Sequence, residues 1–312
     1  MMPTNCRFRN LAASLALLAG LAAPPALAQQ GTARQNDLGP TLSRIAESGI
    51  LYLAVRESAT PFSYLLPDKV TPAGYSWEIC QHVARAIAAR LGKPLEIVPV
   101  TVAASTRLMM VKIGMADIEC GATTNTTGRQ RQVAFSNTFY ISQIGVLVRA
   151  DSGIKTLDDL NGKRVVTTSG TNAERLVSQI ALQREMPIRQ LVGRSNSESM
   201  HLLESGAVDA FVNDDAIVLG QRANADVPDN YLLLSVETNA LEPYGLVLRR
   251  DDPVFKSLVD ATLVQLMQSG EIRDIYERWF TKPIPPSNRS LNLPLSELNR
   301  ATFANPNDAP AN

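Results

Sequence analysis

One pattern recurs along most of the chain and constrains its fold more than any other feature: a short apolar run, a turn, and then a run with helical periodicity. Residues 50–55 form such an apolar run, and Ile79, Val83 and Ile87 follow at the i, i+4, i+8 spacing of one helix face. Gly92 stops that helix before the next apolar run begins. Strands separated by helices in this way predict an α/β fold with right-handed crossovers.

The same reasoning predicts two successive α/β units. The expected strands are residues 50–55, 95–100, a strand around 118, 164–168, 188–192, 208–212, one beginning at 231, and 244–248. The expected helices are residues 41–48, one following Gly74, 107–112, 157–160, one from about 169 through 180, one ending at Gly206, one from 216, and two between 253 and 279. Ser195 and Glu198 fit a capping box for one of them. Beyond Pro286 the chain is polar and rich in proline, which predicts a loosely packed tail.

The first 28 residues have the composition of a secretory signal peptide. Arg7 and Arg9 form a basic region, residues 11–23 form an apolar region, and residues 26–28 form a small-x-small cleavage site. The alternative is a membrane anchor, but the apolar run is short for crossing a bilayer and no later stretch is long enough. We therefore expect the signal to span residues 1–28 and the remaining chain to be exported and soluble.

Cysteine usage fits an oxidising compartment. Of the three cysteines, Cys6 lies within the predicted signal, which leaves Cys80 and Cys120 as an even pair. In an exported protein this pair predicts a disulfide bond, and the alternative is two buried free thiols. His82 and His201 are too scattered to complete a zinc site with two cysteines, so we expect no metal.

Charge and motif content argue against several classes of function. The chain has 30 basic and 30 acidic residues, and removal of the signal subtracts two arginines and no acid, so no basic surface for nucleic acid is expected. We find no H-E-x-x-H, G-x-S-x-G, phosphate-binding G-x-x-x-x-G-K or dinucleotide-binding motif. We therefore expect no cofactor, and we interpret Glu119 beside Cys120 as structural rather than as a catalytic base.

Residues 116–140 (ADIECGATTNTTGRQRQVAFSNTFY) indicate a binding site. An apolar strand around Ile118 leads into a turn with four threonines, and Arg129 follows a few residues later. Backbone N–H groups, hydroxyls and a guanidinium group together suit a carboxylate, which arginine can bind through two hydrogen bonds. The alternative interpretation is a polar loop with a solvated arginine.

This order of strand, T-T-N, spaced arginine and A-F-S resembles the extracytoplasmic amino-acid-binding proteins of ABC importers, which form family 3 of the solute-binding proteins. Within the family it is most similar to the glutamate/aspartate-binding members, and the resemblance covers about residues 38–312. It implies a two-lobed α/β periplasmic-binding-protein fold of type II with a ligand cleft between the lobes. It places lobe 1 in residues 29–147 and 245–312 and lobe 2 in residues 148–244, with crossovers near 148–150 and 242–244.

The resemblance also implies a set of residues for a zwitterionic ligand, whose two charges must both be paired when buried. Arg129 corresponds to the family arginine that grips the α-carboxylate, with Thr124 beside it. Thr171, at a helix start in the T-S-G-T run from Thr168, would bind the same carboxylate. Asp214, at the end of a strand, corresponds to the family acid that pairs with the α-ammonium group.

Two further arginines, Arg56 and Arg107, match positions that hold the side-chain carboxylate in the glutamate/aspartate binders. A neutral amino acid would leave them unpaired in a closed cleft. Asn196 stands where the family often has histidine, so a neutral amide replaces a pH-sensitive donor. Ala122 stands in place of a family serine, and the loop at residues 101–106 is longer than expected. These departures bear on the choice between glutamate and aspartate.

The resemblance implies a periplasmic binding protein that captures L-glutamate or L-aspartate and delivers it to an ABC transporter permease. We expect a monomer without enzymatic activity. One alternative is an enzyme on the same fold, since a few proteins of this fold are dehydratases. Another is a sensory binding protein for the same ligand, which would act through a partner because the sequence contains no kinase or membrane segment.

Overall fold

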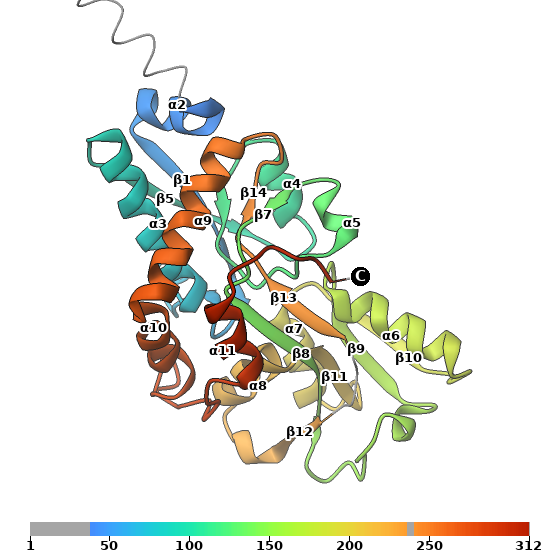
Figure 1. The fold of residues 1–312 in the computed structure, drawn as a ribbon. Helices are drawn as coiled ribbons and strands as arrows, with labels where there is room; N and C mark the ends of the chain where they lie inside the picture. Colours follow the sequence, from blue (N-terminus) through green and yellow to red (C-terminus); the bar gives the residue numbers. More distant parts are fainter. Residues whose placement is uncertain (1–37, 236–239, 312) are drawn as a thin grey trace, which may run out of the picture. The chain divides into compact units, whose positions relative to one another are not determined.

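The computed structural model describes residues 38–235 and 240–311, so the predicted signal over residues 1–28 lies outside the described residues. Two mixed sheets organise the described chain (Figure 1). The first sheet contains β1 (Ile50–Arg56), β5 (Glu96–Val102), β6 (Ile118–Glu119), β7 (Ala134–Phe135) and β14 (Val247–Leu248), in the order β5-β1-β6-β14-β7. The second sheet contains β8 (Tyr140–Arg149), β9 (Arg164–Thr168), β10 (Arg189–Gly193), β11 (Ala210–Asp214) and β12 (Tyr231–Ser235), in the order β10-β9-β11-β8-β12, and β13 (Leu241–Tyr244) pairs with β8. A small third sheet contains β2 (Ser58–Ala59), β3 (Ser63–Leu65) and β4 (Pro72–Ala73).

The helices fall into two groups along the chain, one outside and one within the segment from β8 to β13. The chain before β8 and after β14 contributes α2 (Gly39–Ser48), α3 (Tyr75–Leu91), α4 (Arg107–Lys112), α5 (Thr127–Gln130), α9 (Pro253–Ser269), α10 (Glu271–Phe280) and α11 (Glu297–Ala304). The chain between β8 and β13 contributes α6 (Asn172–Gln183), α7 (Asn196–Glu204), α8 (Asp215–Asn224) and the 3₁₀ turns η1 (Asp158–Leu160) and η2 (Pro228–Asn230). Within the part of the chain that the structure describes, no helix has the length and apolar character needed to span a membrane.

Glycines and capping side chains set helix ends that the sequence predicts. Gly49 and Gly92 adopt left-handed backbone conformations, with φ of 74° and 67°, directly after α2 and α3. The Ser195 hydroxyl accepts from the backbone N–H of Glu198 at 3.1 Å at the start of α7, which is one half of the predicted capping box. Asp252 caps α9 through its carboxylate. These ends depend on one or two local residues, so they are visible in the sequence.

Both faces of the first sheet are covered along β1, an interior strand of the sheet, which is why β1 is largely apolar. On one face Leu53 of β1 packs in a cluster with Val83 of α3 and Val259 of α9. On the other face Ala54 of β1 packs with Val111 of α4. The second sheet is covered in the same way, by α6 on one face and by α7 and α8 on the other. The α/β fold predicted from the sequence is confirmed.

The strand predicted over residues 244–248 is instead two strands, β13 and β14. The chain leaves β13 beside β8 and then enters the first sheet beside β6, so one continuous strand cannot serve both partners. Gly245 lies between the two strands, where a Cβ atom would lie 2.9 Å from the carbonyl oxygen of Ser136. Only glycine fits this close passage.

Two chain segments connect the sheets and pair with each other. Residues 140–143 of β8 pair antiparallel with β13, and this pairing is named the hinge ladder. Residues 144–148 already pair with β11 in the second sheet, so β8 changes partner before residues 148–150, where the crossover is expected. β8 continues as one strand through both pairings, and Ser142 and Gln143 stand just before the change of partner. The crossover expected near residues 242–244 coincides with β13, and the lobe boundaries themselves stay predictions.

The segment after α10 is well packed, so the expectation of a loose tail is wrong. Arg289 donates to the carbonyl oxygens of Ala223 and Ala225 at 3.0 and 2.7 Å. Phe303 of α11 is buried in the core of the first sheet. The chain beyond α11 then runs back past β13 to α5 (Figure 1). These partners lie far away in the chain, and local composition does not reveal them.

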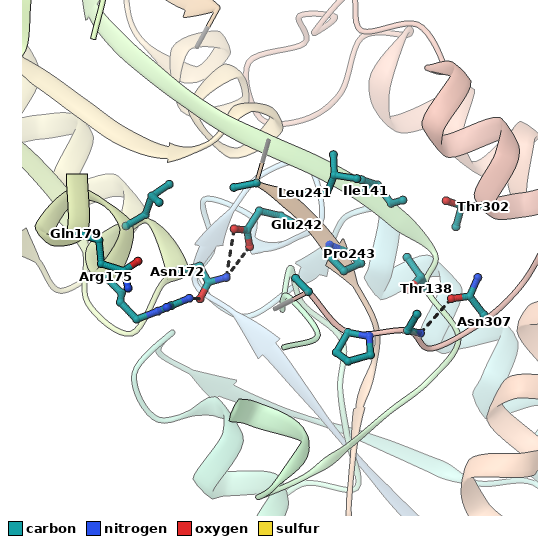
Figure 2. A pocket seen from close by; sticks show the side chains of 15 residues that line it. Thr138, Ile141, Asn172, Arg175, Gln179, Leu241, Glu242, Pro243, Thr302 and Asn307 are labelled. Carbon is teal, nitrogen blue, oxygen red and sulfur yellow. Dashed lines mark hydrogen bonds between the residues drawn. The ribbon is translucent and has the colours of Figure 1, made fainter. Parts of the chain in front are cut away.

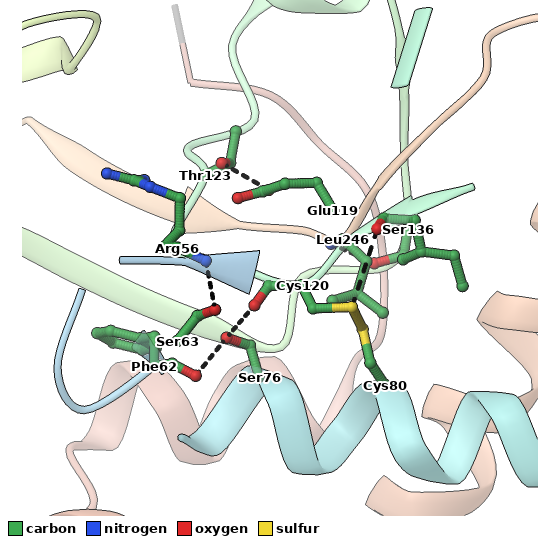
Figure 3. The surroundings of a disulfide bond; sticks show 11 residues. Arg56, Phe62, Ser63, Ser76, Cys80, Glu119, Cys120, Thr123, Ser136 and Leu246 are labelled. Atoms are coloured by element: carbon green, nitrogen blue, oxygen red, sulfur yellow. Dashed lines mark hydrogen bonds between the residues drawn. A yellow bond between two sulfur atoms is a disulfide. The ribbon is translucent and has the colours of Figure 1, made fainter. Parts of the chain in front are cut away.

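The predicted disulfide bond between Cys80 and Cys120 is present (Figure 3). The two Cα atoms lie 6.1 Å apart, and both residues are fully buried. The bond joins α3 to the chain directly after β6. The hydroxyl of Ser76 adds a hydrogen bond to the carbonyl oxygen of Cys120 at 3.1 Å. Together they hold the carboxyl end of β6 against α3, immediately before the threonine-rich turn.

Replacing both Cys80 and Cys120 with alanine should lower the free energy of unfolding by about 3–4 kcal/mol, because the bridge links residues 40 positions apart in the unfolded chain. Urea denaturation followed by circular dichroism measures this change. Mass spectrometry of the non-reduced wild-type protein lacking residues 1–28 should detect no alkylatable thiol. Two free thiols before reduction would contradict the pairing.

Candidate functional site

The predicted ligand residues lie where strands of both sheets end and helices begin. Arg56 is the last residue of β1, Thr124 follows β6, and Asp214 is the last residue of β11. Arg107 and Asn196 are the first residues of α4 and α7. Carboxyl ends of strands and amino ends of helices thus converge on one place, which is where open α/β folds bind ligands.

One small cavity receives side chains from both sheets. Six of the eight predicted ligand residues line it: Arg56, Arg107, Thr124, Thr171, Asn196 and Asp214. Its lining is completed by Ala122, Asn172, Asn213 and Ile217. The volume is about 10 Å³, which leaves room for about one water molecule. The side chains fill the site in this conformation, so a larger ligand requires them to move apart.

The other two predicted residues, Arg129 and Thr168, lie beside the cavity. Arg129 belongs to α5 and donates from Nη1 to the carbonyl oxygen of Thr124 at 2.9 Å. Thr168 is fully buried, and its carbonyl oxygen accepts from the hydroxyl of Thr171 at 2.6 Å. Thr168 therefore supports Thr171 from behind.

Gly170 brings the two halves of the site into contact. Its carbonyl oxygen accepts from Nη1 of Arg107 at 3.2 Å and from Nη2 of Arg129 at 3.1 Å. Its φ is 76°, and a Cβ atom here would lie 2.6 Å from the Cα atom of Ser105. Only glycine allows this approach. Two guanidinium groups therefore reach across the cleft to a neutral backbone carbonyl.

Three guanidinium groups crowd the site. Arg56 and Arg107 are almost fully buried, and Arg129 is half-buried. Burial, followed by the charge of Arg56, lowers the pKa of Arg107 to about 10, and burial, followed by the charge of Arg107, lowers the pKa of Arg129 to about 9. Burial also lowers the pKa of Arg56. For all three arginines burial outweighs the opposing effect of nearby carboxyl groups, so an additional anion would stabilise these cations.

Glu119 supplies one of the acids that face these cations (Figure 3). It is fully buried, and its Oε2 accepts from the hydroxyl of Thr123 at 2.8 Å. That hydroxyl in turn accepts from Nε of Arg107 at 2.5 Å. The charge of Glu119 also opposes the lowering of the Arg56 pKa by burial. A structural role fits this place, because Glu119 acts on the arginines from behind the cavity lining.

Asp214 is the acid that lines the cavity directly. Its Oδ2 accepts from the hydroxyl of Tyr244, while its buried Oδ1 has no hydrogen-bond partner among the described residues. Burial, followed by the nearby carboxyl group of Glu242, raises the pKa of Asp214 to about 8, against the opposite effect of Arg129. A buried acceptor without a partner is costly. An ammonium group placed here would pair with it.

Sequence reasoning missed Glu242 and Asn172. Glu242 lies in β13, is 4% exposed, and accepts from Nδ2 of Asn172 at 2.9 and 3.2 Å. Asn172 lines both the small cavity and an outer cavity of about 510 Å³, which Glu242 also lines (Figure 2). The pair therefore lies between the two cavities. The sequence offered one signal, the carboxylate of Glu242 within a segment that was interpreted only as a crossover. Asn172 offered none, because asparagine is common at the start of a helix.

Asn196 is buried and bonded to protein groups on both sides. Its Nδ2 donates to the carbonyl oxygen of Ser58 at 3.0 Å, and its Oδ1 accepts from Nδ2 of Asn213 at 3.0 Å. The Ser58 carbonyl also accepts from Gln221 at 2.9 Å. Asn196 therefore helps to join β2 to α7 at the rim of the site. Ala122 contributes only a methyl group to the lining.

Comparison with known families and proteins finds matches that span most of the chain. The family model described as bacterial extracellular solute-binding proteins, family 3, matches residues 51–282. The glutamate/aspartate import solute-binding protein of Salmonella typhimurium is 37% identical over 299 residues, which covers 95% of this chain and 97% of that protein. The L-glutamate/L-aspartate-binding protein of Pseudomonas aeruginosa is 37% identical over 299 residues, which covers 96% of each. The resemblance inferred from the sequence is confirmed.

Solved structures share the fold. An arginine-binding protein variant from T. maritima has a TM-score of 0.69 at 24% identity and covers 78% of this chain and 100% of its own. An ancestral amino-acid-binding protein, described as a precursor of cyclohexadienyl dehydratase, has a TM-score of 0.68 at 22% identity and covers 77% of this chain and 99% of its own. At this identity the likeness shows the fold alone, and it confirms the expected two-lobed α/β architecture.

The affinity of the site for a ligand that pairs an ammonium group with Asp214 should decrease as the pH falls below about 8. Below that pH the carboxyl group of Asp214 holds a proton in the empty site, whereas a ligand ammonium group requires the carboxylate form. The proton and the ligand then compete, and affinity should fall by up to about tenfold per pH unit. Calorimetric titrations across this pH range measure the slope.

Two variants control this prediction. Asp214→Asn should bind weakly with a flat pH profile. Asp229→Asn, which alters an exposed carboxylate, should keep the wild-type slope. A flat profile in the wild-type protein would show that Asp214 is not the ammonium partner.

Proposed function

The chain belongs to the bacterial extracellular solute-binding proteins of family 3, and on this premise we propose that it captures L-glutamate or L-aspartate and delivers it to an ABC transporter permease. The observation that carries the proposal is one site that combines three arginines with a buried oxygen of Asp214 to which no described residue donates. A dicarboxylic amino acid has the complementary charges, two carboxylates and one ammonium group. The relatives that are 37% identical are named for glutamate and aspartate, which supports the same ligands.

The α-carboxylate and the α-ammonium group would bind at opposite charges of this site. Arg129 now donates to the carbonyl oxygen of Gly170, and a carboxylate is a stronger acceptor for a guanidinium group. Thr171 is the N-cap of α6, where backbone N–H groups and the helix dipole favour an anion. Thr124 would add its hydroxyl. The Oδ1 of Asp214 would accept from the ammonium group.

Arg56 and Arg107 would hold the side-chain carboxylate and thereby select dicarboxylic amino acids. Both are almost fully buried, and two acids, Glu119 and Asp214, oppose the lowering of their pKa values by burial. A glutamine ligand would bring no second anion and would leave a guanidinium group without its countercharge in an enclosed site. The selectivity would therefore come from the energetic cost of that unpaired cation.

Closure of the two lobes around the ligand would give the conformation that a permease recognises. We place the division at the hinge ladder, with the first sheet in lobe 1 and the second sheet in lobe 2. A ligand held by Arg129 from one lobe and by Asp214 from the other contacts both only when the lobes are together. Such differential contact favours the closed state.

The relatives that match nearly the whole chain are binding proteins, which supports binding without turnover. We further propose that residues 1–28 direct export to the periplasm and that the protein acts as a monomer.

A sensory binding protein would use the same site and differ only in its partner. Co-purification with a permease distinguishes the importer from the sensor, and mass analysis of incubated L-glutamate distinguishes a binder from an enzyme.

Ligand class can be tested by calorimetric titration of unfolded and refolded protein, which removes any co-purified ligand. L-glutamate or L-aspartate should bind, and each should raise the melting temperature, since a ligand at 100 times its Kd adds about 2.7 kcal/mol of stability. L-glutamine and L-asparagine should have much smaller effects. Equal stabilisation by glutamine and glutamate would refute the assignment of Arg56 and Arg107.

Replacing Arg129 with alanine should weaken L-glutamate binding by tens-fold to thousands-fold, because losing one partner of a buried charged pair costs about 2–5 kcal/mol. Arg131 is exposed two residues later and gives a matched control, for which Arg131→Ala should stay within about twofold of the wild type. Small-angle scattering at one ligand concentration should show compaction of the wild type and of Arg131→Ala, but not of Arg129→Ala. Wild-type binding and compaction by Arg129→Ala would mean that the carboxylate partner is wrongly assigned.

A further inference from the structure

Residues 305–311, named the strap, follow α11 and cross the turn that carries the ligand-binding threonines. That turn, residues 123–127, is named the ligand loop. The strap lies outside residues 51–282, which the family model matches, so it is an addition to the shared domain. In Figure 1 it runs from α11 past β13 to α5.

The strap pairs with one edge of the ligand loop. The N–H of Ala311 donates to the carbonyl oxygen of Asn125 at 2.9 Å, and the N–H of Thr127 donates to the carbonyl oxygen of Ala311 at 3.1 Å. Asn125 is fully buried, and its Nδ2 donates to the carbonyl oxygen of Asp308 at 2.8 Å. Gln130 of α5 donates from Nε2 to the same carbonyl oxygen at 3.2 Å. Backbone and side-chain hydrogen bonds therefore join the two segments.

The opposite edge of the ligand loop pairs with the hinge ladder. The N–H of Asn125 donates to the carbonyl oxygen of Pro243 at 2.7 Å, and Thr124 forms an antiparallel bridge with Tyr244. The loop is thus held as a middle strand between β13 and the strap. Without the strap its outer edge would expose backbone groups that need partners, and the loop would be ordered from one side only.

The strap has anchors of its own. The carboxylate of Asp308 pairs with Lys256 of α9 at 3.0 Å, and the carbonyl oxygen of Asn307 accepts from the N–H of Thr138 at 2.8 Å. Oδ1 of Asn307 also accepts from the N–H of Ala309 at 3.0 Å (Figure 2). Because these contacts do not involve the ligand loop, the strap can order the loop rather than follow it.

The path of the ligand loop fixes two groups of the site. The hydroxyl of Thr126 accepts from the N–H of Arg129 at 3.2 Å, and Nη1 of Arg129 donates to the carbonyl oxygen of Thr124 at 2.9 Å. Thr124 itself lines the small cavity. The position of the guanidinium group therefore follows from the conformation of the loop.

We propose that the strap is a positioning element of the ligand site, which holds the ligand loop in the conformation in which Thr124 and Arg129 meet the α-carboxylate. The inference rests on the proposed function, which assigns these two residues to the ligand. A loop that is ordered before binding loses little conformational freedom on binding, so pre-organisation raises affinity. Removal of the strap would leave every ligand-binding side chain in the protein. It would increase the entropic cost of ordering Thr124 and Arg129 when the ligand binds.

Three variants separate positioning from general stability. Deletion of residues 306–312 keeps α11 and removes the strap bonds to the ligand loop, so L-glutamate binding should weaken by at least about tenfold. Ala311→Pro removes the N–H that donates to Asn125, places a ring carbon there instead, and should weaken binding by about fivefold. Ala311→Ser keeps both backbone groups and is the matched control, expected within about twofold. Calorimetry measures Kd, and amide hydrogen exchange of residues 124–127 measures the order of the loop.

For the deletion and for Ala311→Pro we expect weaker L-glutamate binding and faster amide hydrogen exchange in the ligand loop. Their circular dichroism spectra should match that of the wild type. Wild-type affinity in both the truncated chain and Ala311→Pro would overturn it. If the truncated chain does not fold, the comparison of Ala311→Pro with Ala311→Ser decides. If the wild type binds no acidic amino acid, the proposed function fails instead. Loop exchange in the unliganded variants then tests the strap alone, and wild-type exchange rates would overturn the inference.

Discussion

The burial of three guanidinium groups in one cleft is the constraint on which the arrangement of the site depends. Like charges repel, and burial removes the water that would otherwise solvate them. Glu119 offsets part of the charge through Thr123, and Gly170 gives two of the arginines a carbonyl acceptor. Burial still holds the pKa values of all three arginines below their usual value, and Oδ1 of Asp214 receives no hydrogen bond within residues 38–235 and 240–311. Both features point to a ligand that carries both signs of charge.

The ligand loop reaches this site from the hinge. Its inner edge pairs with β13, β13 pairs with β8 in the hinge ladder, and its outer edge pairs with the strap. Backbone hydrogen bonds therefore connect the hinge ladder to the ligand loop, and the ligand loop leads into α5, which carries Arg129. Glu242 adds a second link, because it lies in β13 and accepts from Asn172 of α6 on the side of the second sheet. The geometry of the proposed carboxylate-binding groups and the relation of the two sheets are thus coupled.

Much of the secondary structure could be predicted because periodicity and capping act within one helix or strand. The bounds of α4 and β9 equal the predicted residues 107–112 and 164–168. Most of the predicted ligand residues line one cavity, since the end of a strand and the start of a helix are both visible in a sequence. The change of partner within β8 was not predicted because β8 continues as one extended strand through both pairings. The break at Gly245 was missed because it depends on a distant carbonyl group.

The sequence by itself determined the alternation of strands and helices, an even pair of cysteines, and the concentration of arginines and hydroxyls at strand ends and at the helices that follow them. Only the tertiary structure decided that Glu119 and Glu242 face those arginines, that Gly170 receives two of them, and that the strap holds the ligand loop. A carboxylate in a sequence is the same residue whether water or protein surrounds it. Its energetic effect depends on burial and on the distance to opposite charges, and those quantities arise only when segments far apart in the chain pack together.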